Sequence, residues 1–346
     1  MKHTIFIFLI VLFSGNCGRT ADPGYEFLPL FPGLTGIPLA SFNPIRETRE
    51  LVVPNLVGAF NPGLFQYEDG FLLMPRFYGY QSTAAQNQIA VIKLDSNFLP
   101  SGKLRILNTK IDGTFSYIED PRIFRFKNEL WVAVSAISKY VRKGTQQMFI
   151  SKLSISPDGV VSAAPFVHIK TLNDPENLLQ KNWSPFEFNG ELHFVYSIHP
   201  HRIVKVNTET GNANDVALTP GFSWKFGSPR GGSPIVPFGK DEFLSIFHSS
   251  KEYQIPSGKI IRIYVMGAYT FQNTPPFRVT RYTEKIIADD SYYDDSNHRM
   301  IIFPNGIHIT HDTIFVVLGK NDDGMILSKI DPQALLQGMT LVKQHD

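Results

Sequence analysis

The sequence contains very little cysteine and no excess of either charge. Among 346 residues there is one cysteine, Cys17, so the folded part cannot form an internal disulfide and must be stabilised by packing. The 33 Lys and Arg residues nearly balance the 31 Asp and Glu residues. No basic run is long enough to follow a phosphate backbone. The composition therefore argues against a nucleic-acid partner.

Long stretches with helical periodicity are also missing, and residues 332–337 are the only helical candidate. Aromatic and turn-forming residues are abundant instead, with 28 Phe, 13 Tyr, 26 Gly and 24 Pro. This composition is typical of short strands joined by tight turns. Because 43% of the residues are hydrophobic, the chain can bury a large core. We therefore predict an all-β protein.

The N-terminus has the layout of a signal peptide, predicted over residues 1–21. A basic start is followed by an apolar run at residues 4–13 and then by small residues. The run is too short to be read as a membrane-spanning helix, and a buried first strand is the disfavoured alternative. Cys17 lies where a bacterial lipoprotein carries its lipid, whereas simple secretion would cleave near Ala21. We expect an exported protein, periplasmic, extracellular or tethered to a membrane through a lipidated Cys17.

A unit consisting of a proline-containing segment, a turn and an apolar strand occurs five times. The five copies carry the pairs Asn61-Pro62, Asp120-Pro121, Ser184-Pro185, Ser233-Pro234 and Phe303-Pro304. Successive prolines are 59, 64, 49 and 70 residues apart. Four-stranded propeller blades take about 40–50 residues plus insertions. We predict a five-bladed β-propeller over residues 51–340 after an N-terminal extension at 22–50, with a β-sandwich as the alternative.

The residue before each repeat proline is predicted to face one mouth of the central channel. Inner strands converge on the axis of a propeller, and proline suits the first residue of a strand. Of these five residues only Asp120 is ionisable. A lone carboxyl group among neutral and aromatic neighbours is suited to general acid catalysis. The alternative is that Asp120 caps a turn or pairs with Arg122.

Other polar side chains fall at or near equivalent positions of their repeats. They are Arg76, Glu119, Arg122, Lys181, Asn182, Arg230, His248 and Tyr264. Cations, amides and aromatic rings with few carboxylates suit a carbohydrate, a phosphate or both. We therefore predict these residues, together with Asn61, as substrate-binding. No metal site is expected, because neither His199-Pro200-His201 nor the segment at 321–324 has ligand spacing.

Taken together, these motifs resemble glycoside hydrolase family 130 and the related β-mannosyltransferases and phosphorylases. The resemblance covers about residues 55–330. Its most specific piece is Glu119-Asp120-Pro121-Arg122, in the second of five repeats. Its other pieces are Asn61-Pro62 with Arg76, Lys181 before Ser184-Pro185-Phe186, Gly232-Ser233-Pro234, His248, Tyr264 with Gly267-Ala268, and Phe303-Pro304-Asn305-Gly306. The resemblance implies a five-bladed propeller that acts on β-mannosides or similar glycosides.

The resemblance also implies an inverting reaction with Asp120 as proton donor, acting through a sugar hydroxyl. In the phosphorylases of the family inorganic phosphate is the nucleophile, and no other cofactor is expected. Lys181, His248 and Tyr264 match positions that serve the phosphate pocket. The hydrolases instead need a carboxylate base. The acidic pairs at 289–290 and 294–295 are candidates for that base.

The chain departs from the family pattern at two places. A family Gly-Pro-Arg segment is replaced by the stretch around Arg142, and a family Asp after Gly-Ala is replaced by Gln272. These departures and the expected export count against phosphorolysis, so hydrolysis, phosphorolysis and sugar transfer remain open. Two alternatives belong to other classes of function. One is a surface propeller that binds an oligosaccharide or glycan without catalysis, and the other is a propeller that organises a protein partner.

Overall fold

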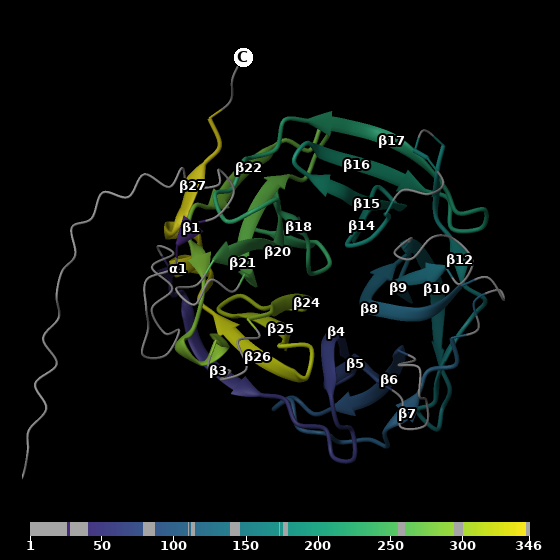
Figure 1. Ribbon diagram of the computed structural model, residues 1–346. Helices are drawn as coiled ribbons and strands as arrows, with labels where there is room; N and C mark the ends of the chain where they lie inside the picture. Colours follow the sequence, from purple (N-terminus) through teal and green to yellow (C-terminus); the bar gives the residue numbers. More distant parts are fainter. Residues whose placement is uncertain are drawn as a thin grey trace, which may run out of the picture.

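The computed structural model describes residues 26–27, 41–78, 87–109, 111, 115–138, 146–172, 174–175, 179–254, 260–293 and 300–343. These residues form five β-sheets that stand around a central axis in a propeller-like ring (Figure 1). The one α-helix among them is α1 (Pro332–Gln337), as predicted. Its N-cap residue Asp331 accepts hydrogen bonds from the main-chain N–H groups of Gln333 and Ala334. The prediction of an all-β ring is confirmed.

The first three sheets follow one another along the chain and are named here sheets 1 to 3. Sheet 1 contains β4 (Ala59–Tyr67), β5 (Gly70–Tyr78), β6 (Asn87–Leu94) and β7 (Arg105–Ile106). Sheet 2 contains β8 (Phe115–Phe126), β9 (Glu129–Ser138), β10 (Gln146–Ile155), β11 (Val161–Ala163) and β12 (Val167–His168). Sheet 3 contains β13 (Lys170–Thr171), β14 (Ser184–Phe188), β15 (Glu191–Ile198), β16 (His201–Val206) and β17 (Asn212–Thr219).

The other two sheets combine strands from both ends of the chain. Sheet 4 contains β18 (Arg230–Gly231), β19 (Val236–Phe238), β20 (Glu242–Gln254), β21 (Ile260–Gln272), β22 (Val279–Thr283), β23 (Ile286–Ile287) and β27 (Met339–Leu341), with β1 (Glu26–Phe27) and β2 (Ser41–Phe42) added at its edges. Sheet 5 contains β3 (Ile45–Glu50), β24 (Ile302–Ile309), β25 (Ile314–Lys320) and β26 (Gly324–Ile330). A short 3₁₀ helix, η2 (Asp290–Tyr293), lies between β23 and β24.

Each predicted repeat forms the innermost part of one sheet, but none of the five repeat prolines is the first residue of a strand. In β4 and β8 the pairing register shifts across the segments that contain Pro62 and Pro121, which is the signature of a β-bulge. The preceding residues, Asn61 and Asp120, have positive φ angles of 46° and 53°. Asn and Asp tolerate this conformation better than most residues. The predicted position of proline is therefore wrong for these repeats, because the segment bends the strand rather than starting it.

The ring is closed by β3, which pairs with β26 in an antiparallel register from Glu50↔Ile326 to Ile45↔Ile330. The link is reinforced by an ion pair between Arg46 and Asp331, with 2.6 Å between N and O. The predicted start of the propeller at residue 51 is therefore too late. Residues 45–50 supply the outer strand of sheet 5 and belong to the ring.

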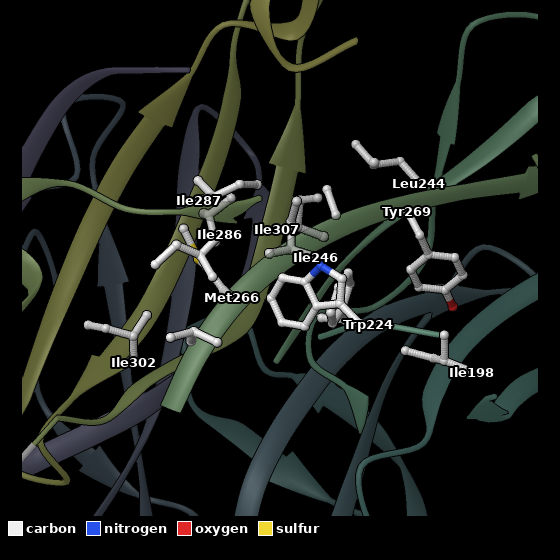
Figure 2. Close-up of a cluster of buried hydrophobic side chains, with 14 of the residues drawn as sticks. Ile198, Trp224, Leu244, Ile246, Met266, Tyr269, Ile286, Ile287, Ile302 and Ile307 are labelled. Carbon is white, nitrogen blue, oxygen red and sulfur yellow. The ribbon is translucent and has the colours of Figure 1, made fainter. Parts of the chain in front are cut away.

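Hydrophobic side chains fill the spaces within and between the sheets. The largest cluster joins sheets 3, 4 and 5 and includes Ile198, Trp224, Ile246, Tyr269 and Ile307 (Figure 2). The indole N–H of Trp224 donates to the carbonyl of Thr283 at 2.7 Å, so its polar atom is paired. Each fully buried side chain of this size contributes roughly 1.5–3 kcal/mol. Packing therefore supplies the stability that a chain with one cysteine cannot obtain from disulfides.

The predicted signal peptide, including Cys17, lies outside the described residues. Within the described ranges, no helix has the length and apolar character needed to cross a membrane.

Candidate functional site

The predicted site residues gather at one mouth of the ring, where the innermost strands begin. Asn61 and Asp120 lie at the bulges of β4 and β8, and Arg230 begins β18. Arg76 lies near the end of β5, opposite Phe60 of β4. In each sheet the first strand starts and the second strand ends on the same side, because the two are antiparallel. The topology therefore brings residues from different repeats to one place.

Asp120 is held by two side chains from sheet 1. The Asn61 amide donates to its Oδ1 at 2.8 Å, and an Arg76 guanidinium nitrogen donates to the same oxygen at 3.3 Å. Only 4% of Asp120 is exposed. The bulge at Glu119/Arg122 turns the carboxyl group away from the regular strand direction. The predicted alternative of a side-chain pair with Arg122 is not found, since that guanidinium contacts the main-chain carbonyl of Asp120 at 3.1 Å.

The neighbouring Glu119 is bound by three donors. Its Oε1 accepts from Arg76 at 2.8 Å and from Asn87 at 3.1 Å, and its Oε2 accepts from Gln146. Burial raises the pKa of Glu119, and the charge of Asp120 adds to this, whereas Arg76 opposes it. Arg76 also lies over the Phe60 ring, 4.6 Å from the centroid. The two buried carboxyl groups thus share one cation.

Arg122 has a different role from the predicted substrate contact. Its guanidinium is fully buried and donates to the carbonyls of Gly232 at 2.6 Å, Gly231 at 3.4 Å and Asp120 at 3.1 Å. These bonds connect β8 of sheet 2 to β18 of sheet 4 and to the residue that follows β18. Gly231 is required here, because a Cβ would lie 2.0 Å from the Asn182 carbonyl oxygen. Arg122 is therefore a positioning residue that brings the two sheets together.

The other side of the mouth is cationic and aromatic. Arg230 donates to the Ser250 hydroxyl at 2.8 Å and lies 5.7 Å from the Tyr264 ring centroid. The His248 ring is stacked with Tyr264 at 6.3 Å and is 4.3 Å from Phe303. Burial, reinforced by the charges of Arg230, Arg122 and Lys181, holds the pKa of His248 well below its usual range. His248 is therefore a neutral ring at neutral pH.

Lys181 and Asn182 lie between the two sides. Lys181 interacts electrostatically both with Glu119 and with His248. Asn182 is buried with a φ of 65°, and its carbonyl packs against Gly231. Lys181 thus adds positive charge near both Glu119 and His248.

Three contributors were not predicted as site residues. Asn87 begins β6 and Gln146 begins β10, and both donate to Glu119. Asn305 is fully buried in β24, and its amide donates to the carbonyls of Asn61 at 2.9 Å and Pro121 at 2.8 Å. Asn305 thereby joins the innermost strands of sheets 5, 1 and 2. In the sequence, only its position directly after a repeat proline indicated that Asn305 belongs to the site.

The candidate positions for a catalytic base differ in their relation to this mouth. Tyr293, the last residue of η2, donates its hydroxyl to the Tyr264 carbonyl at 3.0 Å, so the end of η2 lies beside Tyr264. Asp289 is used locally, accepting from the main chain and hydroxyl of Ser291. Gln272 ends β21, eight residues beyond Tyr264 and thus about 26 Å along the strand. The Asp pair at 294–295 and Arg142 lie outside the described residues.

The same mouth offers hydrogen-bonding capacity. Among the described residues, buried side-chain atoms without a hydrogen-bond partner include Asn61 Oδ1, Arg76 Nε, Asn87 Oδ1 and Ser184 Oγ. Buried polar groups are normally paired, so such atoms mark a place where a ligand or water is accommodated. In the part of the chain that the structure describes, no group of three or more His, Cys, Asp or Glu residues is placed to hold a metal ion.

Comparison with solved structures relates this fold to enzymes of mannoside metabolism. A β-1,2-mannobiose phosphorylase from Listeria innocua, in complex with β-1,2-mannobiose, has a TM-score of 0.61 at 16% identity, covering 86% of this chain and 97% of that chain. A mannose phosphorylase from Leishmania mexicana, in complex with phosphate, has a TM-score of 0.57 at 13% identity, covering 87% and 92%. A structure from the GH130 family of mannoside phosphorylases, described with glycoside hydrolases that target β-1,2-mannosidic linkages, has a TM-score of 0.59 at 12% identity, covering 80% and 85%. The chain therefore has the fold of these proteins.

Comparison of sequences gives a shorter match. The chain is 28% identical over 141 residues to β-mannosyltransferase 1 of Komagataella phaffii. This match covers 36% of the chain and spans about a fifth (20%) of the length of that curated relative. No protein-family model matches the chain. The resemblance deduced from the sequence motifs is thus confirmed at the level of the fold.

Proposed function

We propose that the chain is a five-bladed propeller enzyme that cleaves or forms β-mannosidic bonds, with Asp120 as general acid. Each of the five sheets is taken as one blade. The observation that carries the proposal is the division of one mouth into a carboxyl side, held by Asn61 and Arg76, and a cationic, aromatic side around Tyr264. Arg122 links the two sides through the carbonyls of Gly231 and Gly232. A glycoside with a developing charge finds a proton source on one side and anion-binding groups on the other.

The bonding of Asp120 fixes its orientation for the proposed role as proton donor. Both Asn61 and Arg76 donate to Oδ1, and in the described ranges no side chain is bonded to Oδ2. The proton would therefore be carried on Oδ2, while Oδ1 stays fixed by the two donors. Holding a catalytic group in one orientation lowers the entropic cost of reaction.

The cationic side supports an anionic co-substrate, and inorganic phosphate is the simplest one. Arg230 supplies charge beside the aromatic face of Tyr264, and Lys181 adds charge near His248. Phosphate attack on the anomeric carbon would break the glycosidic bond while Asp120 protonates the leaving oxygen. In hydrolysis a water would replace phosphate, and the acidic segment after η2 would supply the base.

The test is to incubate the purified protein with β-mannooligosaccharides, with and without phosphate, and to identify the products. Phosphorolysis gives mannose 1-phosphate only when phosphate is present, hydrolysis gives mannose in both cases, and transfer gives longer oligosaccharides. Asp120→Asn should lower kcat/KM by about 10²–10⁴-fold. Asp158→Asn, the same change at an exposed turn, is the matched control. Sugar binding without any turnover would support the alternative of a glycan-binding propeller, and full activity of Asp120→Asn would exclude this mechanism.

We also propose that the protein is exported and that Cys17 carries a lipid anchor. The support is the basic start and apolar run that precede this cysteine. Mass spectrometry of the protein from a bacterial membrane fraction should show a lipid-modified N-terminal Cys17, and Cys17→Ser should move the protein to the soluble fraction. An unmodified N-terminus near Ala21 would favour simple secretion.

A further inference from the structure

A groove lies on the mouth side of the ring where sheet 5 meets sheet 1. Its volume is about 730 Å³, and it is lined by two segments. One is the link from β3 to β4, contributing Glu50, Val52, Val53 and others between residues 50 and 59. The other is the turn from β25 to β26, contributing residues between 320 and 326. Pockets for small ligands typically measure about 300–1,000 Å³, so the groove can hold more than one sugar unit.

The groove adjoins the proposed catalytic mouth. Gly319, which precedes its first lining residue Lys320, packs directly on Asn61: a Cβ at Gly319 would lie 2.0 Å from Asn61 Oδ1. Asp322, in the turn that lines the groove, interacts electrostatically with Arg76. The Lys320 ammonium donates to the Ser291 carbonyl of η2 at 2.7 Å, and η2 itself contacts Tyr264. The groove therefore begins within one or two residues of groups that hold Asp120.

The lining has the chemistry of a sugar site. The groove is lined by the charged residues Glu50, Asp323 and Lys320 and by buried apolar residues that include Leu51 and Leu56. Hydroxyl groups of a glycan both donate and accept hydrogen bonds, and the C–H faces of its rings pack on apolar surface. A groove with this mixture suits a neutral, hydroxyl-rich chain better than a compact anion or a lipid tail.

We infer that this groove binds the part of a glycan chain that extends beyond the reacting sugar, so that the natural substrate is an oligosaccharide longer than a disaccharide. The inference rests on the proposed function, since it assumes that the reacting unit lies beside Asp120. It adds a second set of contacts, on sheet 5, to those of the catalytic mouth. Binding energy gained there would favour longer chains.

The first test measures kcat/KM for mannooligosaccharides of two to six units. The wild-type value should rise with chain length. Asp323→Ala should lower the ratio of the tetrasaccharide to the disaccharide value by about 3–10-fold, the equivalent of one hydrogen bond. Val52→Trp should do the same by filling the groove from a position that is 70% exposed and so leaves the core intact. Asp158→Ala, far from the groove, should leave the ratio unchanged.

The second test uses binding and does not depend on turnover. Calorimetry with the same oligosaccharides should show an affinity that increases with length in the wild type and much less in Val52→Trp. If no oligosaccharide is turned over but this length dependence is present, the proposed catalysis is wrong. The inference that the groove binds the extended glycan is then still supported. An affinity and a kcat/KM that are independent of chain length, or variants that affect short and long chains equally, would overturn the inference.

Discussion

The two sides of the mouth are built in different ways. On the carboxyl side, Asn61, Arg76, Asn87 and Gln146 donate five side-chain hydrogen bonds to Glu119 and Asp120. On the cationic side the contacts are mainly stacking and cation–π arrangements around Tyr264. Side-chain hydrogen bonds run there from Arg230 to Ser250 and from Tyr293 to the Tyr264 carbonyl. The carboxyl side is therefore fixed by directional bonds, and the cationic side by softer contacts.

The difference teaches which side is preorganised and which is ready to receive a ligand. Carboxyl groups that are buried together repel each other unless a cation and several donors hold them, so their geometry must be set by the fold. Cations that pack on aromatic faces keep N–H donors available for an incoming anion or hydroxyl. The proposed catalytic group is fixed, and the side proposed to receive the co-substrate is held by softer contacts.

The largest effect is expected from removing the cation shared by the two carboxyl groups. Arg76→Met should destabilise the protein by about 3–5 kcal/mol at neutral pH, because Glu119 and Asp120 stay buried without their partner. The pKa of Glu119 is already raised by burial, so the folded protein binds a proton there more readily than the unfolded chain. The loss should therefore shrink as the pH falls toward the ordinary pKa of Glu.

Urea unfolding of Arg76→Met between pH 4 and 8 checks this, with Arg125→Met at an exposed site as the control. A loss that is equal at every pH would mean that packing over Phe60, and not charge, is what Arg76 provides.

The cationic side should respond to acid with the opposite sign. The pKa of His248 is held low, so the unfolded chain binds a proton there first, and stability is lost as the pH falls below about 6.5, the ordinary value for His. His201, buried elsewhere, has its pKa lowered to about 4 and adds its own loss, about 3 kcal/mol, over the same window. Replacing His201 first, as His201→Gln, removes this background.

In that background, His248→Gln should flatten the remaining fall in unfolding free energy between pH 6.5 and 4. A slope identical to that of His201→Gln alone would show that His248 is not what makes the mouth sensitive to acid.

Ligand affinity should depend on the cationic side more than on the carboxyl side. Arg230→Gln removes a charged donor and should raise the KM for phosphate, or for the glycan in hydrolysis, by about 10–100-fold with a smaller change in kcat. Steady-state kinetics checks this, and Arg278→Gln at an exposed position is the control. A fall in kcat at unchanged KM would mean that Arg230 acts in the chemical step, as proposed for the carboxyl side, and not in ligand binding.

The smallest effect is expected at a donor that positions Glu119 without touching Asp120. Gln146→Met leaves Oε2 of Glu119 without its donor and should cost about 1–3 kcal/mol of stability. Since this hydrogen bond helps to keep the pKa of Glu119 down, the pH–activity profile should move toward higher pH. If Gln146→Asn restores the wild-type pH–activity profile, the amide donor itself is responsible. A pH–activity profile that does not change in Gln146→Met would mean that Gln146 is a purely structural residue.

The sequence was informative where a local rule marks a residue. Asn61 and Asp120 precede repeat prolines, and their positive φ angles explain both the bulges and the choice of Asn and Asp. The helix at 332–337 follows from a capping Asp and a first-turn proline. Proline was nevertheless placed at strand starts, because a bulge and a strand start favour the same residues.

Other features depend on pairing between strands that are distant in the sequence. No local sequence pattern predicts them. Asn87 and Gln146 reach Glu119 because each begins the third strand of its sheet at the same mouth. Arg122 looks like a ligand-binding residue in the sequence, yet its donors are used by the carbonyls of a segment 109 and 110 residues away. The assignment of residues 45–50 to an extension failed for the same reason, since their partner strand lies near the other end of the chain.

The closure of the ring by β3 sets an order of events during synthesis. Lys329 and Glu47, which form an ion pair across the closing strands, are 282 residues apart. The ribosome therefore releases the first strand of the ring long before its partner exists, and the loop to be closed is nearly the whole chain. Until β26 emerges, β3 has an unpaired edge and the mouth is incomplete. A protein assembled in this way completes its fold, and with it the geometry around Asp120, only after its last strands have been made.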